Sequence, residues 1–298
     1  MSSANKMAVA LAVTFGLLAA ETAALSDSEH GRLNIGYTSA FFADVNSKDA
    51  EAAFDLWTKE MGTREGWVTN ASIYNRIERL AADFNSRKLD LAVVKTLDYI
   101  KMRHSLPGTL GFTLAHNGKS TVRYVLLTRE DAKVRDIRDL KGKRLSVIKG
   151  DETSILFLDT YLLEKRQAET KDFFADVTEH IKPSQAILSV FFGQNDASLV
   201  MEDTFNTMAE LNPQIRQKLR VSAASNELVT SLNLFRKDWP ESKKRRVMDI
   251  AEGLKDNPRG RQILMLFKCD GVTRVKEEDL ASMNDLVATY NRLKAGRH

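Results

Sequence analysis

The chain has 298 residues, of which 43% are hydrophobic and 28% are charged, and its formal net charge at pH 7 is +4. These values are typical of globular proteins, and the length allows one large domain or two of medium size. Lysines and arginines are interleaved with acids, and the densest basic run, 243–246, has the pattern of a solvated helix face. The charge distribution therefore argues against nucleic acid as a partner.

An apolar segment stands near the start of the chain. Lys6 precedes a run without charged residues from Met7 to Ala20. The run is shorter than the ~20 apolar residues that a helix needs to cross a bilayer, and no later segment reaches that length. A basic residue followed by such a run is typical of a secretory signal peptide. We expect residues 1–24 to be removed by cleavage near Ala24, with cleavage at Ala20 or a retained anchor as alternatives.

The sequence holds few of the residues that commonly bind metals. Cys269 is the only cysteine, which excludes a disulfide within the chain and a cluster of thiolate ligands. The five histidines lack the i,i+4 spacing by which a helix presents two ligands to one ion. We therefore predict neither a metal site nor a cofactor.

The first part of the chain alternates predicted strands and helices. Short apolar runs indicate strands, whereas apolar residues three or four positions apart indicate helices. The run LDLAVV at 89–94 is almost wholly apolar, as expected of a strand covered on both faces. In chain order we predict a strand at 33–37, a helix from 46 or 47 to 61, a strand at 67–71, a helical stripe at 73–84 and a strand at 89–94.

Two extended segments, 110–115 and 121–128, separate this series from a second one. The second series comprises a strand at 145–148, helices at 154–165 and 185–192, a strand at 197–200, a helix at 205–211 and a strand at 219–222. The segment 231–235 then leads into a tail, 240–294, that we expect to be all helical, with a break at Asn257-Pro258. Two series joined by crossovers near 124–128 and 231–235 predict two α/β lobes with mostly parallel sheets. Ligands in such folds bind beyond the carboxyl ends of the strands.

One turn of the second series has the chemistry of an anion site. The residues Asp-Glu-Thr-Ser stand at 151–154, between a predicted strand and the first turn of a helix. Backbone N–H groups at a helix start lack intrahelical partners and lie at the positive end of the helix dipole, and the hydroxyls of Thr153 and Ser154 add donors. The alternative is that Asp151 or Glu152 caps the helix and holds no ligand. The chain has no G-x-S-x-G, H-E-x-x-H, G-x-G-x-x-G or P-loop motif, so we predict a binding protein and not an enzyme.

Four stretches carry a resemblance to a known family. They are LNIGYTSAF, DFNSRKLDLAVVKTLDYI, DLKGKRLSVIKGDETSILFLDTYLLEK, and FFGQNDASLVMEDTF followed by LNLFRKDWP. In these stretches the chain resembles the type II periplasmic substrate-binding proteins, in particular the phosphate, phosphite and phosphonate binding proteins of ABC transporters. The resemblance implies a two-lobed α/β fold with two crossover strands and a helical C-terminal tail. Lobe one would comprise 25–125 and 233–298, and lobe two 126–232.

The resemblance also implies site residues in lobe two. The family holds the ligand's oxyanion with a serine/threonine tripeptide at a helix start, and the matching positions here are Glu152, Thr153 and Ser154. The acid at the first position departs from the family pattern and would repel a dianionic phosphonate. Asp203 follows the strand at 197–200 and matches a position that contacts a ligand's amino or hydroxyl group. Capping of its own helix is the alternative role for Asp203.

In lobe one the implied site follows the first and third strands. Lys95, Thr96 and Tyr99 stand where the family has a small residue and an aromatic, and the usual glycine is missing. Lys95 would pair with an anionic ligand or offset Glu152, although a lysine at a loop start is often simply solvated. Ser39 and Phe41 would face the same cleft from the end of the first strand.

Together these features predict a monomeric periplasmic protein that closes over a small anionic or zwitterionic solute. The resemblance gives a phosphonate, phosphite or phosphate-like oxyanion as the leading ligand class and an inner-membrane ABC permease as the partner. An alternative is a sensory or accessory protein that uses the same fold to modulate a membrane signalling partner. An exported enzyme is the weaker alternative.

Overall fold

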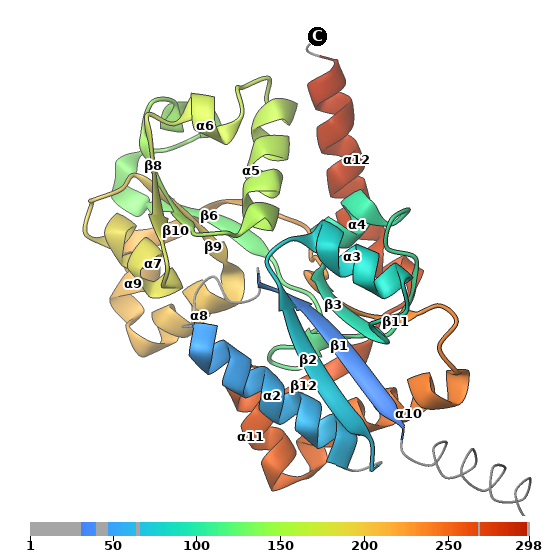
Figure 1. Cartoon of the computed structure of the whole chain (residues 1–298). Coiled ribbons are helices and arrows are strands. Elements are labelled where there is room, and N and C mark those ends of the chain that lie inside the picture. Colours follow the sequence, from blue (N-terminus) through green and yellow to red (C-terminus); the bar gives the residue numbers. More distant parts are fainter. Residues whose placement is uncertain (1–30, 40–46, 64–65, 268, 297–298) are drawn as a thin grey trace, which may run out of the picture.

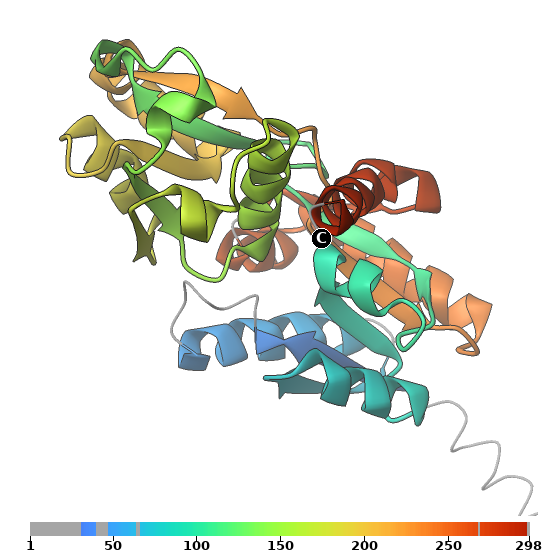
Figure 2. The ribbon, with the colours of Figure 1, turned by 90° about the horizontal axis from the view of Figure 1, so that it is seen from above.

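The computed structural model describes residues 31–39, 47–63, 66–267 and 269–296. Two five-stranded sheets, each flanked by helices, form the centres of two lobes (Figures 1 and 2). None of the helices within the described ranges combines the length and the apolar composition that a membrane span requires.

The first lobe is built on a mixed sheet with the strand order β2-β1-β3-β11-β4. β1 is parallel to β2 and β3, whereas β11 is antiparallel to β3 and β4. Alternate side chains of β3 join different core clusters on the two faces of the sheet, which explains its almost wholly apolar sequence. The elements are β1 (Arg32–Thr38), α2 (Ser47–Thr63), β2 (Val68–Tyr74), α3 (Ile77–Asn85), β3 (Leu91–Lys95), α4 (Thr96–Met102), β4 (Gly108–Leu110), β11 (Ser231–Arg236), α10 (Glu241–Glu252) and α11 (Pro258–Leu266).

The second lobe repeats this arrangement in the order β8-β7-β9-β6-β10. β7 is parallel to β8 and β9, and β6 is antiparallel to β9 and β10. The elements are β6 (Tyr124–Arg129), β7 (Arg144–Ile148), α5 (Glu152–Glu164), α6 (Thr170–Phe173), β8 (Asp176–His180), α7 (Pro183–Phe191), β9 (Ala197–Met201), α8 (Glu202–Leu211), α9 (Pro213–Lys218) and β10 (Leu219–Ala224). In each sheet four of the five strands thus run in the same direction and one interior strand, β11 or β6, runs antiparallel to them, which agrees with the prediction of mostly parallel sheets.

Two segments connect the sheets, 116–123 and 225–230. They run antiparallel at one point, where Val122 N donates to Leu228 O at 2.9 Å and Leu228 N donates to Val122 O at 2.8 Å. The crossover predicted at 231–235 is the interior strand β11 of the first sheet, and the one predicted at 124–128 is likewise an interior strand, β6, of the second sheet. Its apolar residues are fully buried there, so the crossing lies a few residues earlier in the chain.

The C-terminal helix α12 (Ala281–Ala295) touches both lobes. Leu280, just before it, packs in a core cluster of the first lobe, whereas Met283 packs in the main cluster of the second. Arg103 Nη2 also donates to Asn284 Oδ1 at 3.1 Å, which ties the helix to the end of α4. In Figure 2, α12 accordingly lies between α4 and α5.

Most predicted elements are present, and three details differ. Ile73 belongs to β2 and not to the following helix. The C-terminal tail is not all helical, because β12 (Gly271–Arg274) pairs antiparallel with β5 (Phe112–Ala115). The strand β8 was not predicted, since its sequence DVTEH lacks an apolar run.

Candidate ligand-binding site

Helix starts from the two lobes meet at one place. Lys95 ends β3 of the first lobe, and its Nζ donates a hydrogen bond of 2.7 Å to the carbonyl of Gly150, in the turn between β7 and α5 of the second lobe. These residues are 55 positions apart in the sequence. The carboxyl ends of β3 and β7 therefore face each other across the boundary between the lobes, as the two-lobed prediction requires.

The start of α5 is capped by the chain itself. Asp151 Oδ1 accepts hydrogen bonds from Ser154 N at 3.2 Å and from the hydroxyl of Tyr124 at 3.1 Å. The hydroxyl of Ser154 donates to the carbonyl of Asp151 at 2.8 Å. Burial raises the pKa of Asp151, while its hydrogen bonds and the charge of Lys95 act in the opposite direction. Of the alternatives for this turn, capping by Asp151 is present in the structure.

The groups around this turn carry both signs of charge. Lys101 Nζ of α4 lies 3.5 Å from Glu152 Oε2 of α5, and both side chains are more than half exposed. Lys101 is thus the lysine that pairs directly with Glu152, while Lys95 bonds to Gly150 in the same turn. Burial, and then the charge of Glu152, raise the pKa of Asp98, whereas Lys95 and Lys101 act in the opposite direction. The starts of α4 and α5 therefore place ammonium donors and carboxylate acceptors close to one another.

Two buried hydroxyls stand at the carboxyl ends of neighbouring strands of the first lobe. Thr38 ends β1 and is 4% exposed, and Thr96 follows β3 and is 0% exposed. Neither Oγ1 has a hydrogen-bond partner among the described residues. Buried hydroxyls are normally paired, so each is an available donor. Thr38 was not singled out in the sequence, although a threonine directly after an apolar strand was a visible signal.

The remaining predicted site residues differ in burial and in the element that carries them. Thr153 is buried in the first turn of α5, and Ser39 is half-buried directly after β1. Asp203 is half-buried in the first turn of α8, next to Glu202, whose carboxylate lies 3.8 Å from Arg123. Phe41 lies outside the described residues.

Tyr99 lies in the core of the first lobe. It is 5% exposed and shares a cluster with residues of α3, β3 and β11. The guanidinium of Arg103 stands 5.4 Å from its ring centre. Core packing and this cation–π contact account for the ring without a ligand.

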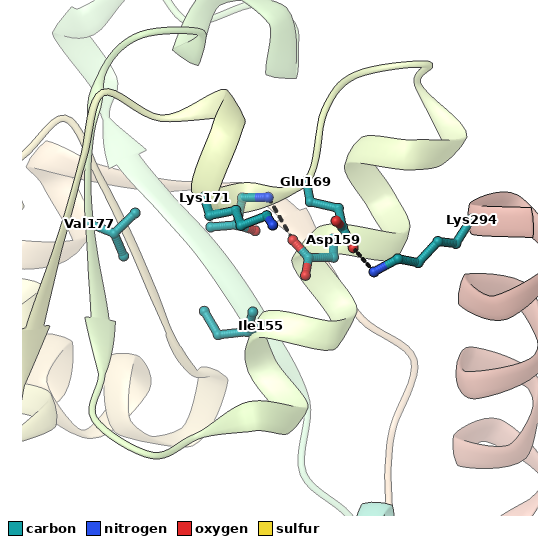
Figure 3. Close-up of a pocket in the computed structure, with 7 residues that line it drawn as sticks. Ile155, Asp159, Glu169, Lys171, Val177 and Lys294 are labelled. Carbon is teal, nitrogen blue, oxygen red and sulfur yellow. Dashed lines mark hydrogen bonds and ion pairs between the residues drawn. The ribbon is translucent and has the colours of Figure 1, made fainter. Parts of the chain in front are cut away.

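A separate pocket of about 360 Å³ lies beside α12 (Figure 3). Ile155 and Val177 form its apolar part, and Glu169 accepts a hydrogen bond of 2.9 Å from Lys294 of α12. Asp159 Oδ1 accepts from Thr170 N at 2.6 Å. None of the predicted site residues lines this pocket, so it is distinct from the meeting point of the helix starts.

Comparison with known proteins decides the family. The sequence matches the family described as "ABC transporter, phosphonate, periplasmic substrate-binding protein" over residues 39–280. The chain belongs to this family. The phosphonate-family resemblance inferred from the four sequence stretches is thereby confirmed, as is the role as a substrate-binding component of an ABC transporter. Membership implies an exported, periplasmic binding protein with a small ligand and a membrane permease as partners.

Solved structures of similar fold include other members of such systems. The binding-protein component of an ABC phosphonate transporter from Pseudomonas aeruginosa is similar with a TM-score of 0.63 and 14% identity, covering 90% of this chain and 89% of that chain. PhnD1 from Prochlorococcus marinus, in complex with methylphosphonate, is similar with a TM-score of 0.63 and 14% identity, covering 88% of this chain and 98% of that one. At these identities the likeness concerns the fold, and it supports the two-lobed type II architecture.

Proposed function

We propose that this binding protein captures its solute at the boundary between the lobes, where the turns after β3 and β7 meet. The observation that carries the proposal is the 2.7 Å bond from Lys95 to the carbonyl of Gly150, because it joins the helix starts of both lobes. A solute bound there contacts both lobes at once and so favours the closed form. Binding and release are sufficient for this role, and we infer no catalytic step.

We propose a small anionic or zwitterionic solute, with a phosphorus oxyanion as the leading class. Family membership and the methylphosphonate bound to PhnD1 support this class. From the first lobe, Lys95 supplies an ammonium and Thr38 and Thr96 supply hydroxyl donors to an oxyanion. The acids Asp98 and Asp203 would suit an amino group on the solute.

We further propose the boundaries and the state of the mature protein. Lobe one comprises 25–125 and 233–298, and lobe two 126–232; the two separate sheets support this division, although β6 begins at Tyr124 and β11 at Ser231, each shortly before the proposed boundary. The protein acts as a monomer that docks on an inner-membrane permease. Cleavage near Ala24 falls outside the described residues, and intact-mass measurement of the exported protein would locate it.

The test is thermal stabilisation of the mature protein by phosphate, phosphite, alkylphosphonates and aminoalkylphosphonates, with sulfonates and amino acids as comparison solutes. A solute at about a hundred times its dissociation constant adds roughly 2.7 kcal/mol to the free energy of unfolding if it binds only the folded state. We expect a shift with a phosphorus oxyanion, and a large loss of that shift in Lys95→Met.

Lys88→Met is the matched control, because Lys88 is an exposed lysine of the same lobe that pairs with Asp83 at 2.8 Å, away from the second lobe. It should leave the stabilisation unchanged. An equal loss in both variants, or no shift with any phosphorus oxyanion, would contradict the proposed site or ligand class.

A further inference from the structure

The carboxylate of Asp151 lies where a ligand's oxyanion would bind at the start of α5. Anions bind at helix N-termini because the first backbone N–H groups are unpaired and the helix dipole is positive there. Here Asp151 Oδ1 accepts the hydrogen bond from Ser154 N at 3.2 Å, and the hydroxyl of Tyr124 donates to the same oxygen at 3.1 Å. The chain therefore supplies its own anion to this helix start.

The hydroxyl of Ser154 is also engaged. It donates to the carbonyl of Asp151 at 2.8 Å, and Ser154 is 0% exposed. Both donors of Ser154 that an oxyanion would use at this helix start, its N–H and its hydroxyl, are thus directed at Asp151. An incoming oxyanion that used either donor would have to break these bonds and would still face the half-buried carboxylate of Asp151.

Neighbouring charges reinforce this effect. Glu152 adds a second carboxylate to the first turn of α5, and Asp98 of α4 interacts with it unfavourably across the lobe boundary. Of the two nearby ammonium groups, Lys101 pairs with Glu152, whereas Lys95 donates to the neutral carbonyl of Gly150 and keeps its charge on the side of the first lobe. A dianionic group placed beside α5 is therefore repelled by these carboxylates, and the lysines only partly offset the repulsion.

We propose that Asp151 is a specificity-determining residue whose carboxylate excludes dianionic ligand groups from the first turn of α5. The ligand group beside this turn is then neutral or cationic, and the anionic part of the ligand lies against Lys95 and the first lobe. This inference rests on the proposed function, because it concerns the ligand held between the lobes.

The test is calorimetric titration of wild type and Asp151→Asn with methylphosphonate and with inorganic phosphate, at a pH of about 8.5, where phosphate is a dianion. Asparagine keeps the oxygen that accepts from Ser154 N and Tyr124 and removes only the charge. We expect weak binding by wild type and a gain in affinity of about tenfold or more in Asp151→Asn. Asp151→Ser retains a capping oxygen without charge and serves as a second variant if Asp151→Asn folds poorly.

Glu152→Gln is the matched control. It removes one negative charge from the same helix turn, but Glu152 is exposed and does not cap α5. We expect its gain to be about threefold or less, because solvent screens an exposed carboxylate. A gain equal to that of Asp151→Asn would overturn the proposal, since the effect would then be one of net charge.

Two further outcomes separate the inference from the proposed function. Tight binding of both dianions by wild type, unchanged in Asp151→Asn, overturns the inference and leaves the proposed function intact. Absence of binding in wild type and all variants, with aminoalkylphosphonates included in the titrations, overturns both.

Discussion

The hydrogen-bond partners and the burial of Asp151 determine its charge state and its effect on stability. This half-buried carboxylate loses part of its hydration, and two hydrogen-bond donors and the nearby charge of Lys95 compensate part of that loss. Burial is the dominant effect, so the pKa of Asp151 is raised. The residue is therefore expected to reduce the stability of the folded state at neutral pH while it orders the start of α5.

Asp151→Asn should make the protein more stable at neutral pH. For a carboxylate with a raised folded-state pKa, the favourable contribution is fully present below the unfolded pKa of about 4 and is lost as the pH rises through the folded pKa. The neutral variant avoids this loss, so its free energy of unfolding at pH 7 should exceed that of wild type. Urea unfolding from pH 4 to 8 measures the difference, which should vanish toward pH 4. A variant less stable than wild type at pH 7 would contradict this account.

The sequence indicated that the turn at 151–154 is important, but it could not decide whether its side chains cap the helix or bind an anion. An acid before a helix predicts a cap, and a helix start with hydroxyls predicts an anion site. The choice depends on Tyr124, 27 residues away, whose hydroxyl reaches Asp151 only after the second sheet has formed. The same is true of Lys95, because no local pattern indicates that its partner is the carbonyl of Gly150. Tyr99 was predicted at the site, yet its ring is buried by residues distant in the sequence.

Among the elements, α12 has the most unusual position. It follows the first lobe in sequence, yet Met283 is 0% exposed within the core cluster of the second lobe. At the other end of the helix, Tyr290 and Lys294 both donate to Glu169 of the second lobe. The helix therefore stabilises the second lobe while Arg103 and Leu280 hold its start against the first.

Met283→Ala should test this role. Truncation of a fully buried methionine removes apolar contacts and leaves a cavity, which costs about 2–4 kcal/mol. Met265→Ala is the matched control, because Met265 is 66% exposed on α11 and its truncation should change the free energy of unfolding by less than about 0.5 kcal/mol. Urea unfolding followed by circular dichroism compares the two. Equal effects would show that α12 does not contribute to the core as described.

Elements with strong apolar patterns were predictable, and elements held by tertiary contacts were not. The run LDLAVV and the stripe that includes Leu80, Ala81 and Phe84 became β3 and α3, because their burial follows directly from the pattern. The strand β8 is polar and is defined by its pairing with β7. The segment 124–128 is apolar and extended, and local sequence cannot distinguish a crossover from the interior strand β6.

At the scale of the whole molecule, the two lobes share one topology and are joined by two segments that pair at Val122 and Leu228, with further bonds from Thr121 to Glu227 and from Arg123 to Ser225. These segments, together with α12, form the connection about which the angle between the lobes can change. Direct contacts across the boundary, such as that between Lys101 and Glu152, then depend on the degree of closure.

Closure can be followed by crosslinking. In the variant Lys101→Cys with Glu152→Cys, a short bifunctional thiol reagent should join the lobes, and the yield should rise when a stabilising solute is added. Native Cys269 should not interfere, because it is buried and burial raises its pKa to about 12. The matched pair Asp83→Cys with Lys88→Cys lies within the first lobe and should crosslink equally with and without solute. A yield between the lobes that does not respond to solute would argue against ligand-driven closure.

Hydrogen exchange measured by mass spectrometry, with the solute that stabilises the protein most, tests the central claim most directly. Binding between the lobes predicts joint protection of peptides covering 95–102 and 149–156, which carry the helix starts of α4 and α5. Peptides covering 169–177 and 290–296, beside the pocket of Figure 3, should exchange as before. Protection confined to those distant peptides, or to one lobe alone, would contradict a site shared by the two lobes.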